Sequence, residues 1–219
     1  AVRSVLAQDY EGPMEIIVSD DASTDRTVEI VSRDLEKDRG RHSSRFLRRA
    51  SNTGSKSAHL ADVFQHVTGD ILVSFDADDV SVPCRVSRLA AAFESDVSVR
   101  AAYSAFSQID EKGQPRRRRK VARPRPGLTA SDWFASVDAY APGATLAVDR
   151  EVLEKFRPLD GTAHEDVVLP FRASLLGDVA FIDEPLVLAR RHTNSLTADS
   201  DRFASLASFR ERTGRGIAR

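Results

Sequence analysis

The order of strand and helix patterns in the first half of the chain is the feature that most limits how it can fold. Residues 14–19 form an apolar run typical of a buried strand, and residues 23–37 carry apolar side chains at helical spacing. The same succession of strand and helix patterns continues in residues 44–50, 56–70, 70–75 and 82–95. Alternating strands and helices predict an α/β fold, with a mostly parallel central sheet flanked by helices.

The second half of the chain is less regular. Residues 98–110 alternate like a strand, and the polar, basic stretch 111–127 predicts a loop longer than most connections. A helix is expected to begin near Thr129, and the late strands are expected to be interrupted at Pro185. The other patterns are a strand running into a helix, a helix, the late strands and a terminal helix, in residues 144–156, 165–178, 179–192 and 199–219.

Composition argues against several classes of protein. The net charge of −1 over 219 residues gives no overall field that would attract a nucleic acid. Cys84 is the single cysteine, so no internal disulfide can form, which fits a reducing compartment. No apolar run approaches the roughly 20 residues of a membrane span, and residues 1–10 lack the apolar centre of a signal peptide. We therefore expect a cytoplasmic protein that binds no nucleic acid.

Acidic side chains stand at the ends of two predicted strands. Asp20 and Asp21 end the first strand, and Asp76, Asp78 and Asp79 follow the run that begins at residue 71. In open α/β sheets, ligands bind beyond the carboxyl ends of the strands. If the two strands are parallel, both acidic groups face the same site.

Crowded carboxylates repel one another unless a partner neutralises them. Mg²⁺ and Mn²⁺ favour oxygen ligands, and Mg²⁺ is often held by one or two carboxylates together with substrate phosphates. The alternative is that these acids cap the following helix, whose N-terminus favours negative charge. That alternative is strongest for Asp79, which lies nearest the helix expected after Pro83.

Five segments together resemble the family 2 glycosyltransferases, which have the nucleotide-sugar-binding GT-A fold. In chain order they are SVLAQDY, MEIIVSDDASTDRT, NTGSKSA, TGDILVSFDADD and HEDVVLPFRA. The resemblance runs from residue 1 to about residue 197. Each acidic motif is weak alone, but their order and spacing make the combination specific.

The resemblance implies a single GT-A domain and an inverting sugar transfer. Residues 1–108 would form the nucleotide-sugar-binding half, and residues 109–219 the acceptor-binding half with the catalytic base. The donor would be a nucleoside diphosphate sugar, most often a UDP-sugar, and the cofactor Mn²⁺ or Mg²⁺. The acceptor would be a saccharide or lipid-linked hydroxyl in polysaccharide or glycolipid synthesis.

The acidic strand ends match the donor site of this family. The resemblance implies that Asp20 and Asp21 meet the nucleotide base. Asp76 and Asp78 match the DXD element, so Asp76 would lie near the ribose and Asp78 would bind the metal. Asp79 is close enough in sequence to assist them.

Asp166 falls where the family places its general base, with Glu165 beside it. A positioned carboxylate can take the proton that an acceptor hydroxyl loses as it attacks. The local sequence allows another role, because Asp166 also stands at the start of a predicted helix, where an acid is favourable.

The resemblance also implies roles for Lys56, Arg191 and His192, and Trp133 is a further candidate in a predicted helix. Lys56 would be near the nucleotide, or else a solvated lysine. Arg191 or His192 would reach the diphosphate or the metal. Trp133 would either stack on an acceptor sugar or belong to the core.

The chain departs from the family pattern at two places. Family members begin with an apolar strand upstream of SVLAQDY, and the sequence starts without it. That strand would lie in the middle of the sheet, so its absence would leave two neighbours with unpaired backbone groups. We expect the natural protein to include it. The second departure is His59-Leu60, where relatives often have Arg-Asn, and we expect His59 and His66 to be packing or surface residues.

Two other functions fit parts of the sequence. An apolar strand followed by D-x-D-x-V is also typical of haloacid-dehalogenase-like phosphatases, with Asp76 as nucleophile, Asp78 as acid, and Asp178 and Asp183 as metal ligands. That motif normally opens its fold, whereas here two strand-helix units precede it.

The other alternative rests on the basic run from Arg116 to Arg125. Such a run can bind an anionic membrane surface without catalysis, or bring a transferase to the inner face of a membrane. A solvated loop that closes over the substrates is the alternative for the same residues.

Overall fold

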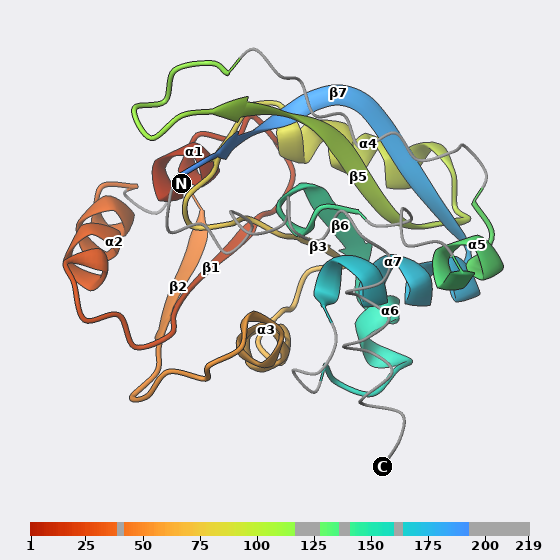
Figure 1. Ribbon diagram of the computed structural model, residues 1–219, viewed down its shortest axis with the longest axis horizontal. Coiled ribbons are helices and arrows are strands. Elements are labelled where there is room, and N and C mark those ends of the chain that lie inside the picture. Colours follow the sequence, from red (N-terminus) through yellow and green to blue (C-terminus); the bar gives the residue numbers. More distant parts are fainter. Residues whose placement is uncertain (39–41, 117–127, 136–140, 160–163, 193–219) are drawn as a thin grey trace.

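The computed structural model describes residues 1–38, 42–116, 128–135, 141–159 and 164–192 (Figure 1). Its helices are α1 Val2–Leu6, α2 Thr27–Glu36, α3 Lys56–Phe64, α4 Arg85–Ser95, α5 Ala130–Ala135, α6 Arg150–Glu154 and α7 Glu165–Leu176. Its strands are β1 Glu15–Asp20, β2 Ser43–Arg48, β3 Ile71–Val73, β4 Val80–Ser81, β5 Val99–Ile109, β6 Leu146–Asp149 and β7 Asp178–Arg190. The predicted elements are therefore present within the described ranges. The expected terminal helix and most of the basic loop lie outside them.

Local sequence explains several element boundaries. Ser55 caps α3, because its side chain accepts a hydrogen bond from the Ala58 N–H. Asp149 caps α6 in the same way, through the Glu151 N–H. The expected interruption at Pro185 is a register shift instead of a break, since β7 continues past it while its pairing with β5 jumps from Ile182 to Pro185. A proline is tolerated at such a bulge because no ladder hydrogen bond is needed from it.

The strands form two separate sheets. β1 and β2 make a parallel pair, and five strands form a second sheet in the order β3-β6-β5-β7-β4. In that larger sheet only β5 and β7 are parallel, while β3-β6, β5-β6 and β4-β7 are antiparallel. The prediction of a mostly parallel sheet is therefore wrong for the central sheet. The alternation of strand and helix patterns could not reveal the antiparallel pairing, because β3 and β4 pair with strands from the second half of the chain.

Helices cover both faces of the five-stranded sheet, and successive strand residues point to opposite faces. Leu89 of α4 packs with Ala102 and Ala147 on one face. On the other face α5, α6 and α7 pack against residues next to these in sequence, including Tyr103 and Val148. Figure 1 shows α4 on one side of the long β5–β7 pair and α6 and α7 on the other. The core holds the strands rigidly, so the loops at their ends can carry a site.

Trp133 is a core residue. Its side chain is 3% exposed and its ring meets Tyr103 edge-on, with centroids 6.2 Å apart. This excludes a stacking surface for an acceptor sugar at Trp133, which the sequence had left open. Within the described residues, no helix is long and apolar enough to cross a membrane.

Candidate functional site

The three acids after β3 lie on a loop, residues 74–79, that connects β3 to β4; we call it the acid loop. The Ser74 N–H donates to the Leu146 carbonyl at its start, and Asp79 N–H donates to the Asp76 carbonyl within it. Its ends are fixed to opposite edges of one sheet, since β3 pairs with β6 and β4 pairs with β7. Strand pairing thus determines where the acids stand.

Lys56 joins the acid loop to the start of α7. Its Nζ lies 2.9 Å from Asp76 Oδ1 and 2.8 Å from Glu165 Oε1. Burial works to lower the pKa of Lys56, but the two carboxylates outweigh burial and raise it. The ammonium is therefore charged throughout the physiological range. Lys56 is thus paired with two carboxylates while 38% of its side chain stays exposed, and its place near the nucleotide stays a prediction.

Glu165 is the buried partner in this arrangement. Its side chain is 8% exposed, and Oε2 also accepts from the Ser57 hydroxyl at 3.3 Å. Burial tends to raise the pKa of Glu165, yet Lys56 brings it below its ordinary value. The Lys56–Glu165 ion pair needs a glycine at position 143, because a Cβ there would stand 3.0 Å from Glu165 Oε1.

Asp166, the candidate base, follows Glu165 in the first turn of α7. Burial, reinforced by the charge of Glu165, raises the pKa of Asp166 to about 6. Its backbone carbonyl accepts from the Ala141 N–H at 3.1 Å, which fixes the helix start. In the described part of the chain, no side chain donates a hydrogen bond to the Asp166 carboxylate. A half-buried carboxylate that titrates near neutral pH is suited to accept a proton.

Asp78 and His192 come together from positions 114 residues apart. His192 Nε2 lies 3.1 Å from Asp78 Oδ2, at the end of β7. The described residues contain no group of three or more His, Cys, Asp or Glu side chains that could hold a metal. The two side chains nonetheless fit a Mg²⁺ or Mn²⁺ ion that takes its other ligands from water and substrate phosphates.

Arg190 holds the acid loop, although sequence reasoning selected its neighbour Arg191. The Arg190 N–H donates to Asp79 Oδ1 at 2.8 Å, and its Nε donates to the Asp78 carbonyl at 3.0 Å. Its Nη1 reaches the carbonyls of Asp110 and Glu111, where the basic loop begins. No sequence signal distinguished the two arginines. A diphosphate role for Arg191, whose N–H donates to the Ile109 carbonyl, remains a prediction.

Asp20 is buried at the end of β1. Only 6% of it is exposed, and Oδ2 accepts from the Ser23 N–H. Its Oδ1 is buried without a hydrogen-bond partner in the described structure. A buried acceptor with no partner is costly, and a ligand donor would satisfy it.

Asp21 stands next to a small polar cluster. It accepts from the Thr53 N–H and hydroxyl, and its Oδ1 lies 3.4 Å from His59 Nδ1 and 3.7 Å from Arg49 Nε. Burial tends to raise the pKa of Asp21, but Thr53, His59 and Arg49 together lower it. His59 therefore belongs to this cluster instead of serving only as a packing or surface residue.

The two acidic groups are linked by α3, although their strands belong to different sheets. Lys56, at the start of α3, contacts Asp76, and His59, one turn later, contacts Asp21. The structure thus brings Lys56, Asp76 and Glu165 into one cluster and Asp78 and His192 into another. Thr53, Arg49 and Gly143 were missed, because their partners are distant in sequence.

This arrangement of strands, helices and acid loop has the architecture of GT-A-like glycosyltransferases. The chain belongs to glycosyl transferase family 2, whose sequence model matches residues 1–157. An uncharacterized glycosyltransferase of Nostoc sp. is 28% identical over 99% of the chain and 69% of its own length. The putative glycosyltransferase EpsE of Bacillus subtilis is 31% identical over 59% of the chain and 45% of its own length.

Solved structures support the fold. S. aureus TarS (residues 1–349) in complex with UDP-GlcNAc superposes with a TM-score of 0.67 and 21% identity, over 96% of the chain and 59% of those TarS residues. The mannosyltransferase PcManGT of Pyrobaculum calidifontis, in complex with GDP-Man and Mn²⁺, gives 0.66 and 23% identity, over 100% of the chain and 59% of its own. The chain thus spans little more than half of either structure.

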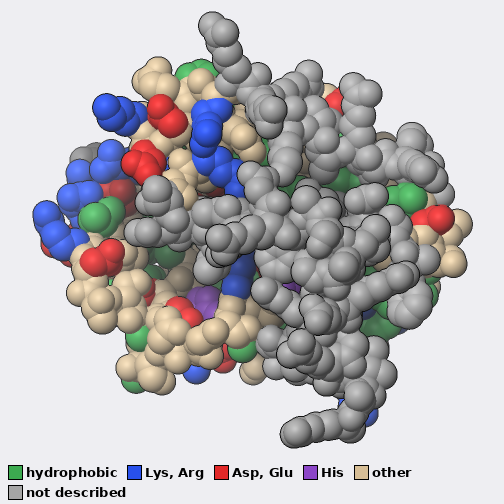
Figure 2. Space-filling view, in the orientation of Figure 1, with side chains coloured by type: hydrophobic (Ala, Val, Ile, Leu, Met, Phe, Trp, Pro, Cys, Tyr) green, Lys and Arg blue, Asp and Glu red, His purple; other side chains and the backbone are tan. Residues whose placement is uncertain are grey.

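Family membership decides against the phosphatase alternative, whose later metal acids are also placed elsewhere. Asp178 Oδ2 accepts from the Ser98 hydroxyl at the far end of β7 from His192. The anionic-surface alternative rests on residues outside the described ranges, except Arg116. On the face in Figure 2, the described Lys and Arg side chains lie beside Asp and Glu, so they form no region of one sign.

Proposed function

We propose that this domain transfers a hexosyl group from a nucleoside diphosphate sugar to an acceptor hydroxyl, with inversion and with a divalent cation. The observation that carries the proposal is the Lys56 bridge, because it brings the DXD acid Asp76 beside Glu165, the neighbour of the candidate base. Donor and acceptor chemistry then occur within one site. The acceptor is a saccharide or a lipid-linked hydroxyl.

Asp20 is the residue that would contact the nucleotide base. Its buried Oδ1 has no hydrogen-bond partner among the described residues, so it could accept from an N–H of that base. Uracil, thymine and guanine offer a ring N–H for such a contact. We propose a UDP-sugar as the first donor to test, and TarS in complex with UDP-GlcNAc supports that choice.

Asp78 and His192 would hold the cation. When bound there, Mn²⁺ or Mg²⁺ would stabilise negative charge on the departing diphosphate. Asp166 takes the proton of the acceptor hydroxyl while the hydroxyl oxygen forms a bond to the anomeric carbon. The bond from that carbon to the diphosphate oxygen breaks, and the electron pair leaves with the diphosphate. Attack from the opposite face inverts the anomeric centre.

The test is thermal unfolding of the protein with a panel of nucleoside diphosphates and their sugars, with and without Mn²⁺. A ligand at a hundredfold excess over its Kd stabilises by about 2.7 kcal/mol. We expect metal-dependent stabilisation by a uracil or guanine nucleotide, lost in Asp78→Ala and kept in Asp70→Ala, whose side chain is 94% exposed. Lack of response to every nucleotide would refute the proposal.

Stereochemistry and localisation need separate measurements. NMR of the product early in the reaction distinguishes an inverted from a retained anomeric bond. We also propose that the domain works at the cytoplasmic face of a membrane, through its basic loop. Sedimentation with anionic vesicles that is unchanged when Arg116 to Lys120 are neutralised would contradict that proposal.

A further inference from the structure

Arg85 is the largest fully buried side chain among the described residues, with 0% exposure. Its guanidinium carbon lies 4.4 Å from the centroid of the Phe75 ring. A buried charge is normally paired with an opposite charge. Within the described ranges, however, no carboxylate oxygen lies within ion-pair distance of Arg85.

The local structure makes this position unfavourable for a cation. Arg85 is the first residue of α4, and the first turn of that helix contains no acidic residue. The N-terminus of a helix carries partial positive charge and disfavours a cation. Burial also disfavours the charge and lowers the pKa of Arg85 to about 9. Helix formation and core packing therefore do not explain an arginine here.

The hydrogen bonds of Arg85 do offer an explanation. Its Nη2 donates to the Ser74 carbonyl at 2.6 Å, and its Nη1 donates to the Ser81 hydroxyl at 3.0 Å. Ser74 begins the acid loop, and Ser81 follows it in β4. One planar guanidinium therefore joins the two ends of the segment that carries all three acids.

The charge of Arg85 acts on the same segment. Among the carboxylates, Asp76 and Asp79 are those whose charges favour the charged form of Arg85. A cation beneath the loop reduces the mutual repulsion of the acids before any ligand is present. Arg190 holds the same segment from β7, through Asp79 and the Asp78 carbonyl.

We propose that Arg85 is a positioning residue that holds the acid loop in the shape that binds the metal and diphosphate. Arg85 touches neither ligand and acts through Ser74 and Ser81. The inference rests on the proposed function, because the loop must bind a metal and a diphosphate for its shape to matter. Lysine cannot replace Arg85, since its single ammonium lacks the planar fork that reaches two acceptors at once.

The test compares Arg85→Met and Arg85→Lys with Arg88→Met. Arg88 lies one turn further along α4 and is 57% exposed, which makes it a matched control. Two affinities are measured by calorimetry: that of UDP or GDP, whichever binds the wild type more tightly, without metal, and that of Mn²⁺ with the nucleotide present. Loss of a residue that orients metal ligands typically weakens metal affinity by about 10- to 100-fold.

We expect both Arg85 variants to lose about 10- to 100-fold in Mn²⁺ affinity, while metal-free nucleotide affinity stays within about twofold and Arg88→Met changes neither. Wild-type Mn²⁺ affinity in either Arg85 variant would overturn the proposal. Equal loss of both affinities would also overturn it, because that pattern indicates general damage. A wild-type protein that binds no nucleotide with Mn²⁺ would instead refute the proposed function, and this inference with it.

Ser81→Ala covers the case in which the Arg85 variants do not fold. This variant keeps the buried charge and removes only the acceptor of Nη1. We expect a smaller loss of Mn²⁺ affinity, about three- to tenfold, because the Nη2 bond to the Ser74 carbonyl stays in place. Unchanged Mn²⁺ affinity in Ser81→Ala would contradict the role of the fork.

Discussion

Asp79→Asn is expected to stabilise the protein in the absence of ligands. Burial raises the pKa of Asp79 to about 6, a hydrogen bond from the Arg190 N–H opposes the rise, and the charges of Asp78 and Asp76 add to it. A carboxylate whose pKa is higher in the folded than in the unfolded state is less favourably ionised in the folded state. Its ionisation therefore lowers the free energy of unfolding at neutral pH. Asparagine removes the charge, and its Oδ1 can still accept from the Arg190 N–H, now 2.8 Å from Asp79 Oδ1.

The size of the effect follows from the pKa. A rise of about two units corresponds to about 3 kcal/mol, at 1.36 kcal/mol per unit. Because Asp79 is partly exposed, solvent screening reduces this to about 1–2 kcal/mol. In a chain of this size each kcal/mol shifts Tm by about 2–4 °C, so we expect Asp79→Asn to raise Tm by about 2–8 °C.

The pH dependence gives the sign of the prediction. Since the folded pKa lies above the unfolded one, the penalty is absent below about pH 4, grows between about pH 4 and 6, and is constant above that. The assay is thermal unfolding in EDTA at pH 4 and pH 7.5. A stabilisation equal at both pH values, or a lower Tm for Asp79→Asn at pH 7.5, would refute the electrostatic explanation.

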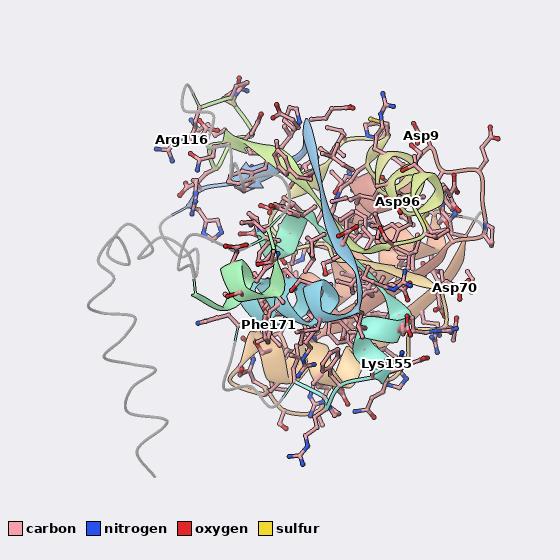
Figure 3. All side chains as sticks on the ribbon, turned by 90° about the vertical axis from the view of Figure 1, so that its right-hand side faces the viewer. Asp9, Asp70, Asp96, Arg116, Lys155 and Phe171 are labelled. Carbon is pink, nitrogen blue, oxygen red and sulfur yellow. The ribbon has the colours of Figure 1, made fainter. Side chains whose placement is uncertain are left out.

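Asp70→Asn is the matched control for this experiment. Its side chain is 94% exposed, and in Figure 3 Asp70 lies on the side of the molecule opposite Arg116. The Arg116 N–H donates to the Gln108 carbonyl, near the Asp110 and Glu111 carbonyls that accept from Arg190. We expect Asp70→Asn to leave Tm unchanged within about 1 °C at both pH values, because exposed substitutions change stability by about 0.5 kcal/mol at most.

Three further predictions concern the base, the core and a helix cap. The transfer rate should be half-maximal near pH 6, because burial and Glu165 raise the pKa of Asp166 to about 6 and the base must be ionised. Glu165→Gln should move that midpoint to lower pH in a kcat profile, and a move to higher pH would contradict the assignment. Trp133→Ala should cost about 3–5 kcal/mol in urea unfolding, against less than about 0.5 kcal/mol for the exposed Leu175→Ala. Ser55→Ala should lose about 0.5–2 kcal/mol in the same assay, and Ser55→Asp should restore most of it.

Sequence patterns located the elements well and their pairing poorly. The apolar runs at β1 and β5 are long enough to identify strands, and the cap at Ser55 lies where the turn-rich loop meets the helical pattern. Antiparallel pairing of β3 with β6 depends on a partner more than 70 residues away, which periodicity does not encode. The division into halves stays a prediction, although the five-stranded sheet takes strands from both halves.

The candidate site likewise contains residues that the sequence predicted and residues that only the fold reveals. The acids stood out because carboxylates rarely cluster at a strand end without a partner. The cations that hold them did not stand out, because one arginine among many carries no local signal. Arg85 and Arg190 can be identified only once the fold places them against Ser74, Ser81 and the acid loop.

The antiparallel pairing of β4 with β7 has a consequence for synthesis of the chain. Asp78 and its partner His192 are 114 residues apart, and the residues that pair with β4 are Val187 and Leu188. At about 5–20 residues per second, a ribosome needs on the order of ten seconds between the two positions. Throughout that interval the nascent acid loop lacks β7 and Arg190. The part of the molecule that we expect to bind the metal is therefore among the last to take shape.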